Sequence, residues 1–117
     1  MSEATKRLLS TLGLCARARR LVIGTPMVCE RLRSDSERGA AAERVYVVLE
    51  AMDTSDNTHA KITSKCKFYN IPHYRIDVTA EQLAHAIGKT AATAAVGILD
   101  AQLTQAVRTH LQSTENH

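Results

Sequence analysis

Aromatic residues are scarce in this chain. Its 117 residues contain no tryptophan, one phenylalanine and three tyrosines. RNA-recognition motifs and oligonucleotide-binding barrels stack bases on aromatic side chains, so this composition argues against both classes. Hydrophobic residues make up 44% of the chain, and the core must be built mainly from Ala, Val, Leu and Ile. We expect a single domain spanning residues 1–117, as is usual for this length.

Signatures of catalysis, metal binding and membrane insertion are also missing. The glycines match no phosphate-binding pattern, and no His or Cys pair has the spacing of a metal site. Cys15, Cys29 and Cys66 are widely spaced among apolar residues, which predicts buried free thiols in a reducing compartment. No apolar run reaches membrane-spanning length. We therefore expect a cytoplasmic monomer without cofactor, metal or membrane association.

Positive charge is concentrated near the N-terminus. Residues 1–33 carry seven Lys and Arg side chains against two glutamates, a formal charge of +5, whereas the whole chain has +3. Such a cluster is either a solvated helix face or an electrostatic footprint for a polyanion. Its densest part is Arg17, Arg19 and Arg20, directly before the short apolar run Leu21-Val22-Ile23.

The residues after this run predict the start of a helix. Thr25 would be the N-cap, and Pro26 would occupy the first helical position, where its missing N–H costs nothing. The free amides of a helix N-terminus carry partial positive charge. Together with nearby guanidinium groups they suit phosphates and base edges. This segment therefore predicts a nucleic-acid-binding surface.

Helical and strand patterns alternate along the chain. Helices are expected over residues 3–18, 25–34, 56–69, 80–87 and from 101 onward, and strands over residues 21–23, 45–49, 73–78 and 94–99. The runs at 45–49 and 94–99 are unbroken and apolar, which is typical of central strands covered on both faces. Apolar and polar residues alternate along 73–78, which favours an edge strand. Residues 36–43 are predicted to form a polar loop. The pattern predicts an α/β fold in which helices sandwich a sheet.

Three sequence blocks together resemble a known family. They are Ala-Arg-Arg-Leu-Val-Ile-Gly-Thr at 18–25, Lys-Cys-Lys-Phe-Tyr-Asn-Ile-Pro at 65–72 and Glu-Gln-Leu-Ala-His-Ala-Ile-Gly-Lys at 81–89. In order and spacing the chain resembles the YlxQ-like bacterial branch of the ribosomal-protein superfamily of archaeal L-seven-Ae and eukaryotic L-thirty-e. The resemblance covers roughly residues 5–111. It implies a three-layer α/β/α sandwich around a four-stranded mixed sheet, and a non-catalytic protein that binds kink-turn or ribosomal RNA.

The resemblance also implies which residues contact RNA. In relatives, the second helix enters the widened groove of the kink-turn, and the loop before the last strand packs on a bulged nucleotide. The matching positions are Arg20, Gly24, Thr25, Lys89, Thr90 and Ala91. Pro26 and Met27 stand where strong kink-turn binders have Asn and Glu, which weakens direct base readout. Arg17 and Arg19 add charge for the phosphate backbone.

Two other functions remain open from the sequence. A protein-interaction module of the same fold would use Met27 as an adaptable apolar contact. An enzyme would use Glu50 and Asp53, which follow a central strand where ligands of open α/β sheets bind. We favour capping and loop roles for these two acids.

Overall fold

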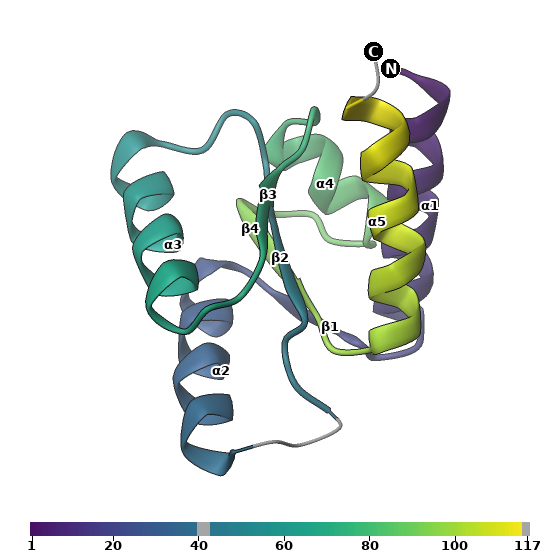
Figure 1. The fold of residues 1–117 in the computed structure, drawn as a ribbon. Helices are drawn as coiled ribbons and strands as arrows, with labels where there is room; N and C mark the ends of the chain where they lie inside the picture. The colour runs from purple at the N-terminus through teal and green to yellow at the C-terminus, as the bar shows by residue number, and fades with distance from the viewer. Residues whose placement is uncertain (40–42, 116–117) are drawn as a thin grey trace.

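The computed structural model describes residues 1–39 and 43–115, and over these residues five helices surround a four-stranded sheet (Figure 1). The elements in chain order are α1 (Glu3–Arg17), β1 (Leu21–Ile23), α2 (Thr25–Arg38), β2 (Val47–Glu50), α3 (Asp56–Phe68), β3 (His73–Arg75), α4 (Ala80–Ala86), β4 (Ala95–Ile98) and α5 (Ala101–Glu115). This order confirms the alternation of helices and strands predicted from the sequence.

The sheet is mixed and has the spatial order β1-β4-β2-β3. β4 runs antiparallel to both of its neighbours, β1 and β2, whereas β3 runs parallel to β2. The predicted edge position of residues 73–75 is confirmed. The two predicted central strands, β2 and β4, are the inner pair, and every residue in both is buried.

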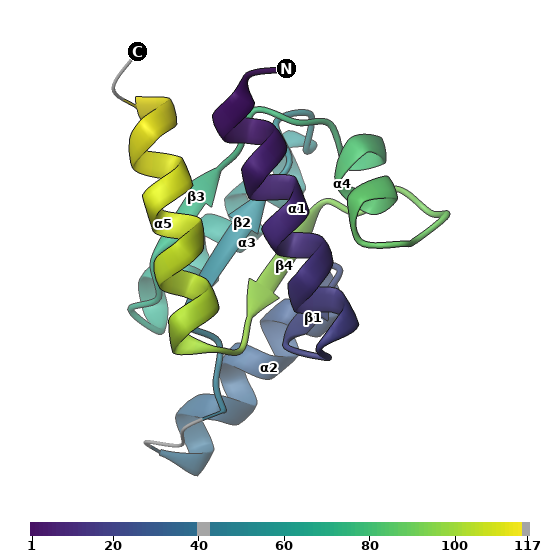
Figure 2. The same cartoon turned by 90° about the vertical axis from the view of Figure 1, so that its right-hand side faces the viewer.

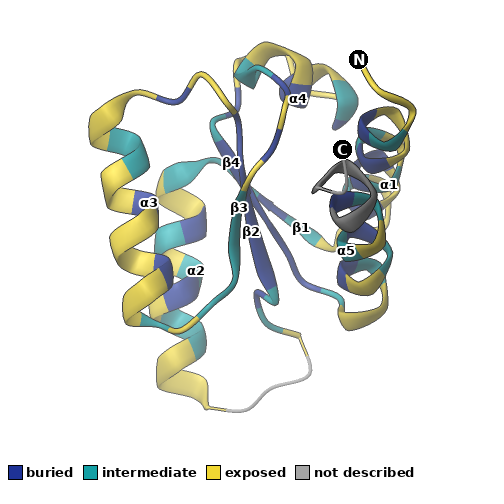
Figure 3. Ribbon diagram, turned by 45° about the horizontal axis from the view of Figure 1, so that its top comes forward, coloured by how far each residue is buried: buried dark blue, intermediate teal, exposed yellow. Residues whose placement is uncertain are grey.

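Helices cover both faces of the sheet. In the view of Figure 2, α1 and α5 lie in front of the sheet with α4 beside them, while α2 and α3 lie behind it. Alternate residues of β2 divide between the two layers: Val47 and Leu49 pack with α1, α4 and α5, whereas Val48 packs with α2 and α3. The buried strands between two half-exposed helical layers are visible in Figure 3. The predicted three-layer α/β/α sandwich is confirmed.

Side-chain caps begin four of the helices, with Ser2, Ser55, Thr79 and Asp100 at the starts of α1, α3, α4 and α5. The Ser55 hydroxyl accepts a hydrogen bond from the Thr58 N–H at 3.2 Å, and Asp100 accepts from the Leu103 N–H at 2.9 Å. Thr79 and Gln82 form a reciprocal capping box at the start of α4. These local bonds fix where α3, α4 and α5 begin.

Helix α2 is longer than predicted. It continues to Arg38, so residues 36–38 of the predicted loop are helical, and residues 40–42 of that loop lie outside the described residues. Arg33 pairs with Glu30 and Glu37 one turn away on either side, and Arg38 pairs with Asp35. Such pairs at spacings of three and four stabilise the polar C-terminal turns of α2, which lie beyond its buried residues Val28 and Leu32.

The three cysteines are free thiols, as predicted, but only Cys15 and Cys66 are buried, whereas Cys29 is partly exposed. Burial, with a smaller effect of Asp100, raises the pKa of Cys15 to about 11. Burial also raises the pKa of Cys66 to about 12. Both thiols therefore stay protonated and unreactive at neutral pH. In the described part of the chain, no helix is long and apolar enough to cross a bilayer.

Candidate nucleic-acid interface

Gly24 joins the sheet to α2. It has a φ of +93°, a conformation that favours glycine, and its N–H donates to the Ala95 carbonyl at 2.9 Å. Its own carbonyl accepts from the Val28 N–H at 2.9 Å, which forms the first hydrogen bond of the helix. The start of α2 is therefore held directly beside the beginning of β4.

Thr25 is not the N-cap, contrary to the sequence-based prediction. Gly24 occupies that position, so Thr25 is the first helical residue and Pro26 the second. Because Thr25 already has helical geometry, its hydroxyl does not reach a first-turn amide. Its Oγ1 is buried and has no hydrogen-bond partner among the described residues. A buried hydroxyl without a protein partner is rare in folded proteins and marks the start of α2 as unusual.

The segment from Lys89 to Ala91 lies opposite this helix start. The loop folds back on α4, since the Lys89 N–H donates to the Ala84 carbonyl at 2.8 Å and the Thr93 N–H donates to the Ala80 carbonyl at 3.0 Å. Gly88, with a φ of +78°, makes the turn possible. The side chains of Lys89, Thr90 and Ala91 remain exposed.

A groove of about 460 Å³ separates the two segments. We call it the α2 groove. One wall is the start of α2, the other is the 89–94 loop, and Thr58 of α3 closes one side. No sequence pattern indicates Thr58, because its place in the groove depends on the packing of α3 against α2. Two of the pieces predicted to form the site are thus brought together.

Arg17 adjoins this region from α1. A Cβ placed on Gly13 would lie 3.0 Å from the Ala86 carbonyl oxygen and 3.5 Å from an Arg17 guanidinium nitrogen. The close crossing of α1 and α4 therefore places Arg17 next to the end of α4, three residues before Lys89. Arg17 and Lys89 are both exposed and form no ion pair with any described residue.

Arg19 and Arg20 lie elsewhere, in the turn between α1 and β1. Arg20 precedes β1, whose far end carries Gly24, and its carbonyl pairs with the Leu99 N–H at the other end of β4. Its guanidinium lies 3.7 Å from the Glu43 carboxylate. Arg19 is exposed and adopts a left-handed φ of +58°. Of the three arginines, Arg17 lies beside the end of α4, whereas Arg19 and Arg20 lie in the turn before β1, away from the start of α2.

Ion pairs remove much of the predicted N-terminal charge excess. Arg31 and Arg33 belong to the basic cluster identified in the sequence, but they pair with Asp35 and with Glu30 and Glu37. Asp35 is partly buried, yet hydrogen bonds from Val45 N–H, Arg38 and Arg31 hold its pKa below the usual value. The C-terminal part of α2 is therefore close to neutral, and the unpaired positive charge lies nearer α1 and the 89–91 segment.

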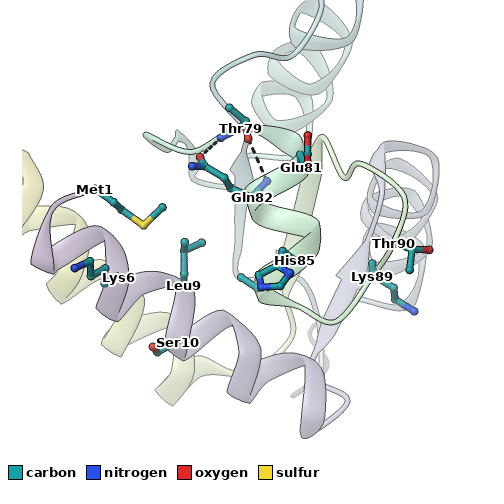
Figure 4. Close-up of a pocket in the computed structure, with 11 residues that line it drawn as sticks. Met1, Lys6, Leu9, Ser10, Thr79, Glu81, Gln82, His85, Lys89 and Thr90 are labelled. Atoms are coloured by element: carbon teal, nitrogen blue, oxygen red, sulfur yellow. Dashed lines mark hydrogen bonds between the residues drawn. The ribbon is translucent and has the colours of Figure 1, made fainter.

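A second, larger groove lies between α1 and α4 (Figure 4). Its volume is about 1110 Å³, and Leu9 of α1 and His85 of α4 extend into it. Lys89 and Thr90 line this groove as well as the α2 groove. The 89–91 segment is therefore a ridge between two depressions.

Glu50 is a structural carboxylate at the end of β2. It is fully buried, and its oxygens lie 2.8 Å from His59 Nδ1 and 2.8 Å from His73 Nε2, with Arg75 Nε at 3.5 Å. The capping or loop role expected for Glu50 is wrong, because its partners come from α3 and β3, far away in sequence. Asp53 does cap, accepting from the Ala80 N–H at 2.8 Å. No cluster of His, Cys, Asp or Glu within residues 1–39 and 43–115 is arranged to hold a metal ion.

Comparison with known proteins gives the family. The sequence profile of the ribosomal protein L7Ae/L30e/S12e/Gadd45 family matches residues 6–107, and the chain belongs to this family. It is similar to the RNA-binding protein YlxQ of Bacillus subtilis (strain 168), with 36% identity over 80 residues that cover 68% of this chain and 71% of the relative. The RNA-binding protein YlxQ of Enterococcus faecium is 28% identical over 90 residues, covering 76% and 79%.

Solved structures share the fold. A protein of unknown function from Bacillus halodurans C superposes with a TM-score of 0.76 at 28% identity, covering 91% of this chain and 97% of that chain. The Giardia lamblia 15.5kD RNA binding protein superposes with a TM-score of 0.72, covering 99% of this chain and 91% of that one. The latter is only 16% identical, so this likeness concerns the fold alone.

The structural role of Glu50 is testable by substitution. Glu50→Gln keeps the shape but removes the charge that His59, His73 and Arg75 share. We expect the free energy of unfolding to fall by about 1.5–3 kcal/mol, as for hydrogen bonds to charged groups. Urea denaturation followed by circular dichroism measures this loss. Asp53→Ala, which removes an exposed cap, should cost only about 1 kcal/mol. Unchanged stability of Glu50→Gln would contradict the structural role.

Proposed function

We propose that this protein is a non-catalytic RNA-binding protein that recognises structured, kink-turn-like RNA through the α2 groove and acts in the cytoplasm as a monomer, free or on the ribosome. The observation that carries the proposal is the Gly24–Ala95 hydrogen bond, which holds the helix start beside the 89–91 segment. The curated relatives that support it are named RNA-binding proteins. The proposed contacts are Gly24, Thr25, Pro26, Met27, Lys89, Thr90 and Ala91, with Arg17 beside them.

The chemistry of the groove suits an RNA backbone at a distorted helix. Amides at the start of α2 offer hydrogen bonds, and Lys89 and Arg17, which form no ion pair with any described residue, offer charge. Neither Pro26 nor Met27 forms the polar base contacts of an Asn or a Glu. Backbone contacts and RNA shape therefore dominate recognition. If roughly 3–5 phosphates are engaged, log K should fall with log salt with a slope of about −3 to −4.

The position of each basic residue predicts its contribution to binding. Arg17→Ala and Lys89→Ala should each weaken binding of a kink-turn RNA and reduce the salt slope by about 0.9, because each loses one phosphate contact. Arg20→Ala should have a smaller effect, since Arg20 lies at the far end of β1 and near Glu43. Fluorescence anisotropy titrations at several salt concentrations measure both quantities.

Arg33→Ala is the matched control for this experiment. Arg33 is an exposed arginine of α2 that already pairs with Glu30 and Glu37, so its loss should leave the slope unchanged. Equal effects of Arg33→Ala and Lys89→Ala would mean that only overall charge matters, and would contradict a localised interface.

Pro26 and Met27 give a gain-of-function test. Met27 is 60% exposed, so a side chain at this position is free to reach a base. The double variant Pro26→Asn with Met27→Glu should bind a kink-turn RNA with tandem G·A pairs more tightly, by about 1–3 kcal/mol per restored base contact. Pro26→Ala with Met27→Ala is the control. Equal affinities of the two double variants in the anisotropy assay would argue against base readout at these positions.

A protein-interaction module is the second candidate, and the exposed Met27 at the start of α2 favours it. Methionine adapts to varied apolar partners. Complexes recovered from cells should dissociate after ribonuclease treatment if RNA is the partner. Complexes that persist and are lost in Met27→Ala would support the protein module instead.

A further inference from the structure

Three exposed side chains of α3 lie on one helix face. With 100° between successive residues, Lys61, Lys65 and Phe68 fall within an arc of about 60°. All three side chains are exposed, and the outer surface of α3 is open to solvent (Figure 3). The buried residues Ile62 and Cys66 lie on the neighbouring arc and anchor the helix to the sheet. We call Lys61, Lys65 and Phe68 the α3 stripe.

The stripe continues from the α2 groove. Thr58, which lines that groove, lies on the same side of α3, one turn before Lys61. From Thr58 to Phe68 the helix rises about 15 Å, the length of about four nucleotides at the roughly 3.4 Å spacing of a stacked strand. A strand leaving the groove therefore meets two lysines and then an aromatic ring.

Phe68 is unusually placed for the chain's one phenylalanine. It is 79% exposed, more than any other large hydrophobic side chain among the described residues. Tyr69 packs edge-on against it with ring centroids 4.9 Å apart, which leaves the Phe68 ring supported from one side. A supported, exposed ring beside cations is the arrangement on which unpaired bases stack.

The charge of the stripe fits a polyanion. Neither Lys61 nor Lys65 forms an ion pair with any residue in the described ranges. Both amines are therefore available to phosphates, unlike the paired arginines of α2.

We propose that the α3 stripe is a second RNA-binding subsite, which takes an unpaired strand that extends from RNA bound in the α2 groove. Lys61 and Lys65 neutralise its phosphates, and Phe68 stacks on one of its bases. This inference rests on the proposed function, because the groove delivers the strand to α3.

The test compares two RNA probes with the same kink-turn, one blunt-ended and one with a five-nucleotide single-stranded extension on each strand. Phe68→Ala should weaken binding of the extended probe by about 5- to 150-fold and leave the blunt probe unaffected. Lys61→Ala with Lys65→Ala should lower the salt slope for the extended probe by about 1.4, given about 0.7 for each phosphate of a single strand.

Lys67→Ala is the matched control on the same helix. Lys67 is exposed but lies about 100° around the helix from Phe68 and farther from Lys61 and Lys65. Lys67→Ala should therefore change the affinities for the blunt and the extended probe equally. Phe68→Leu keeps an apolar side chain without the ring. If stacking is responsible, Phe68→Leu should weaken binding of the extended probe as much as Phe68→Ala does.

The outcomes separate the two proposals. If the wild type binds both probes with equal affinity and Lys89→Ala weakens both, the α2 groove stands and the α3 subsite is wrong. The subsite is also wrong if Phe68→Ala and Phe68→Leu weaken binding of the extended probe, relative to the blunt probe, no more than Lys67→Ala does. A wild-type protein that binds neither probe would overturn the groove and the subsite together.

Discussion

The main-chain contact between Gly24 and Ala95 is the constraint on which the proposed interface depends. One residue closes the ladder between β1 and β4 and also accepts the first hydrogen bond of α2. The backbone angle, not space, demands glycine here: φ is +93°, while a Cβ would meet no atom within 4 Å. Any change that moves this junction would separate the start of α2 from the 89–91 segment and open the groove between them.

The pairing of charged side chains, rather than their number, determines where the surface of the protein carries unpaired positive charge. The chain carries a modest +3, and the sequence concentrates positive charge in its first 33 residues. In the folded protein, the arginines in the latter half of α2 are matched by carboxylates on the same helix. Arg17, Lys61, Lys65 and Lys89 have no such partners among the described residues. Lys89 lines the groove, Arg17 lies beside the end of α4, and Lys61 and Lys65 lie on the outer face of α3, so a polyanion along this side meets unpaired cations.

Local patterns predicted most of the fold, and the failures have physical causes. Unbroken apolar runs identified β2 and β4, and the Thr79 capping box is encoded within four residues. The cap of α2 was misplaced by one residue because the positive φ of Gly24 depends on its partner in β4. Helix α2 exceeded its predicted length because ion pairs stabilise a segment without an apolar stripe.

The candidate site was less accessible to sequence reasoning, since it depends on packing between distant segments. The resemblance to a family indicated Gly24, Thr25 and the 89–91 segment. It indicated neither Thr58 nor the distance of Arg20 from the α2 groove.

Backbone amide chemical shifts of the isotope-labelled protein, followed during titration with a kink-turn RNA, test the central claim most directly. The account predicts the largest changes at Gly24, Thr25, Met27 and residues 89–91, with α5 unaffected. Chemical-shift changes confined to α5, with none at the residues of the α2 groove, would contradict it.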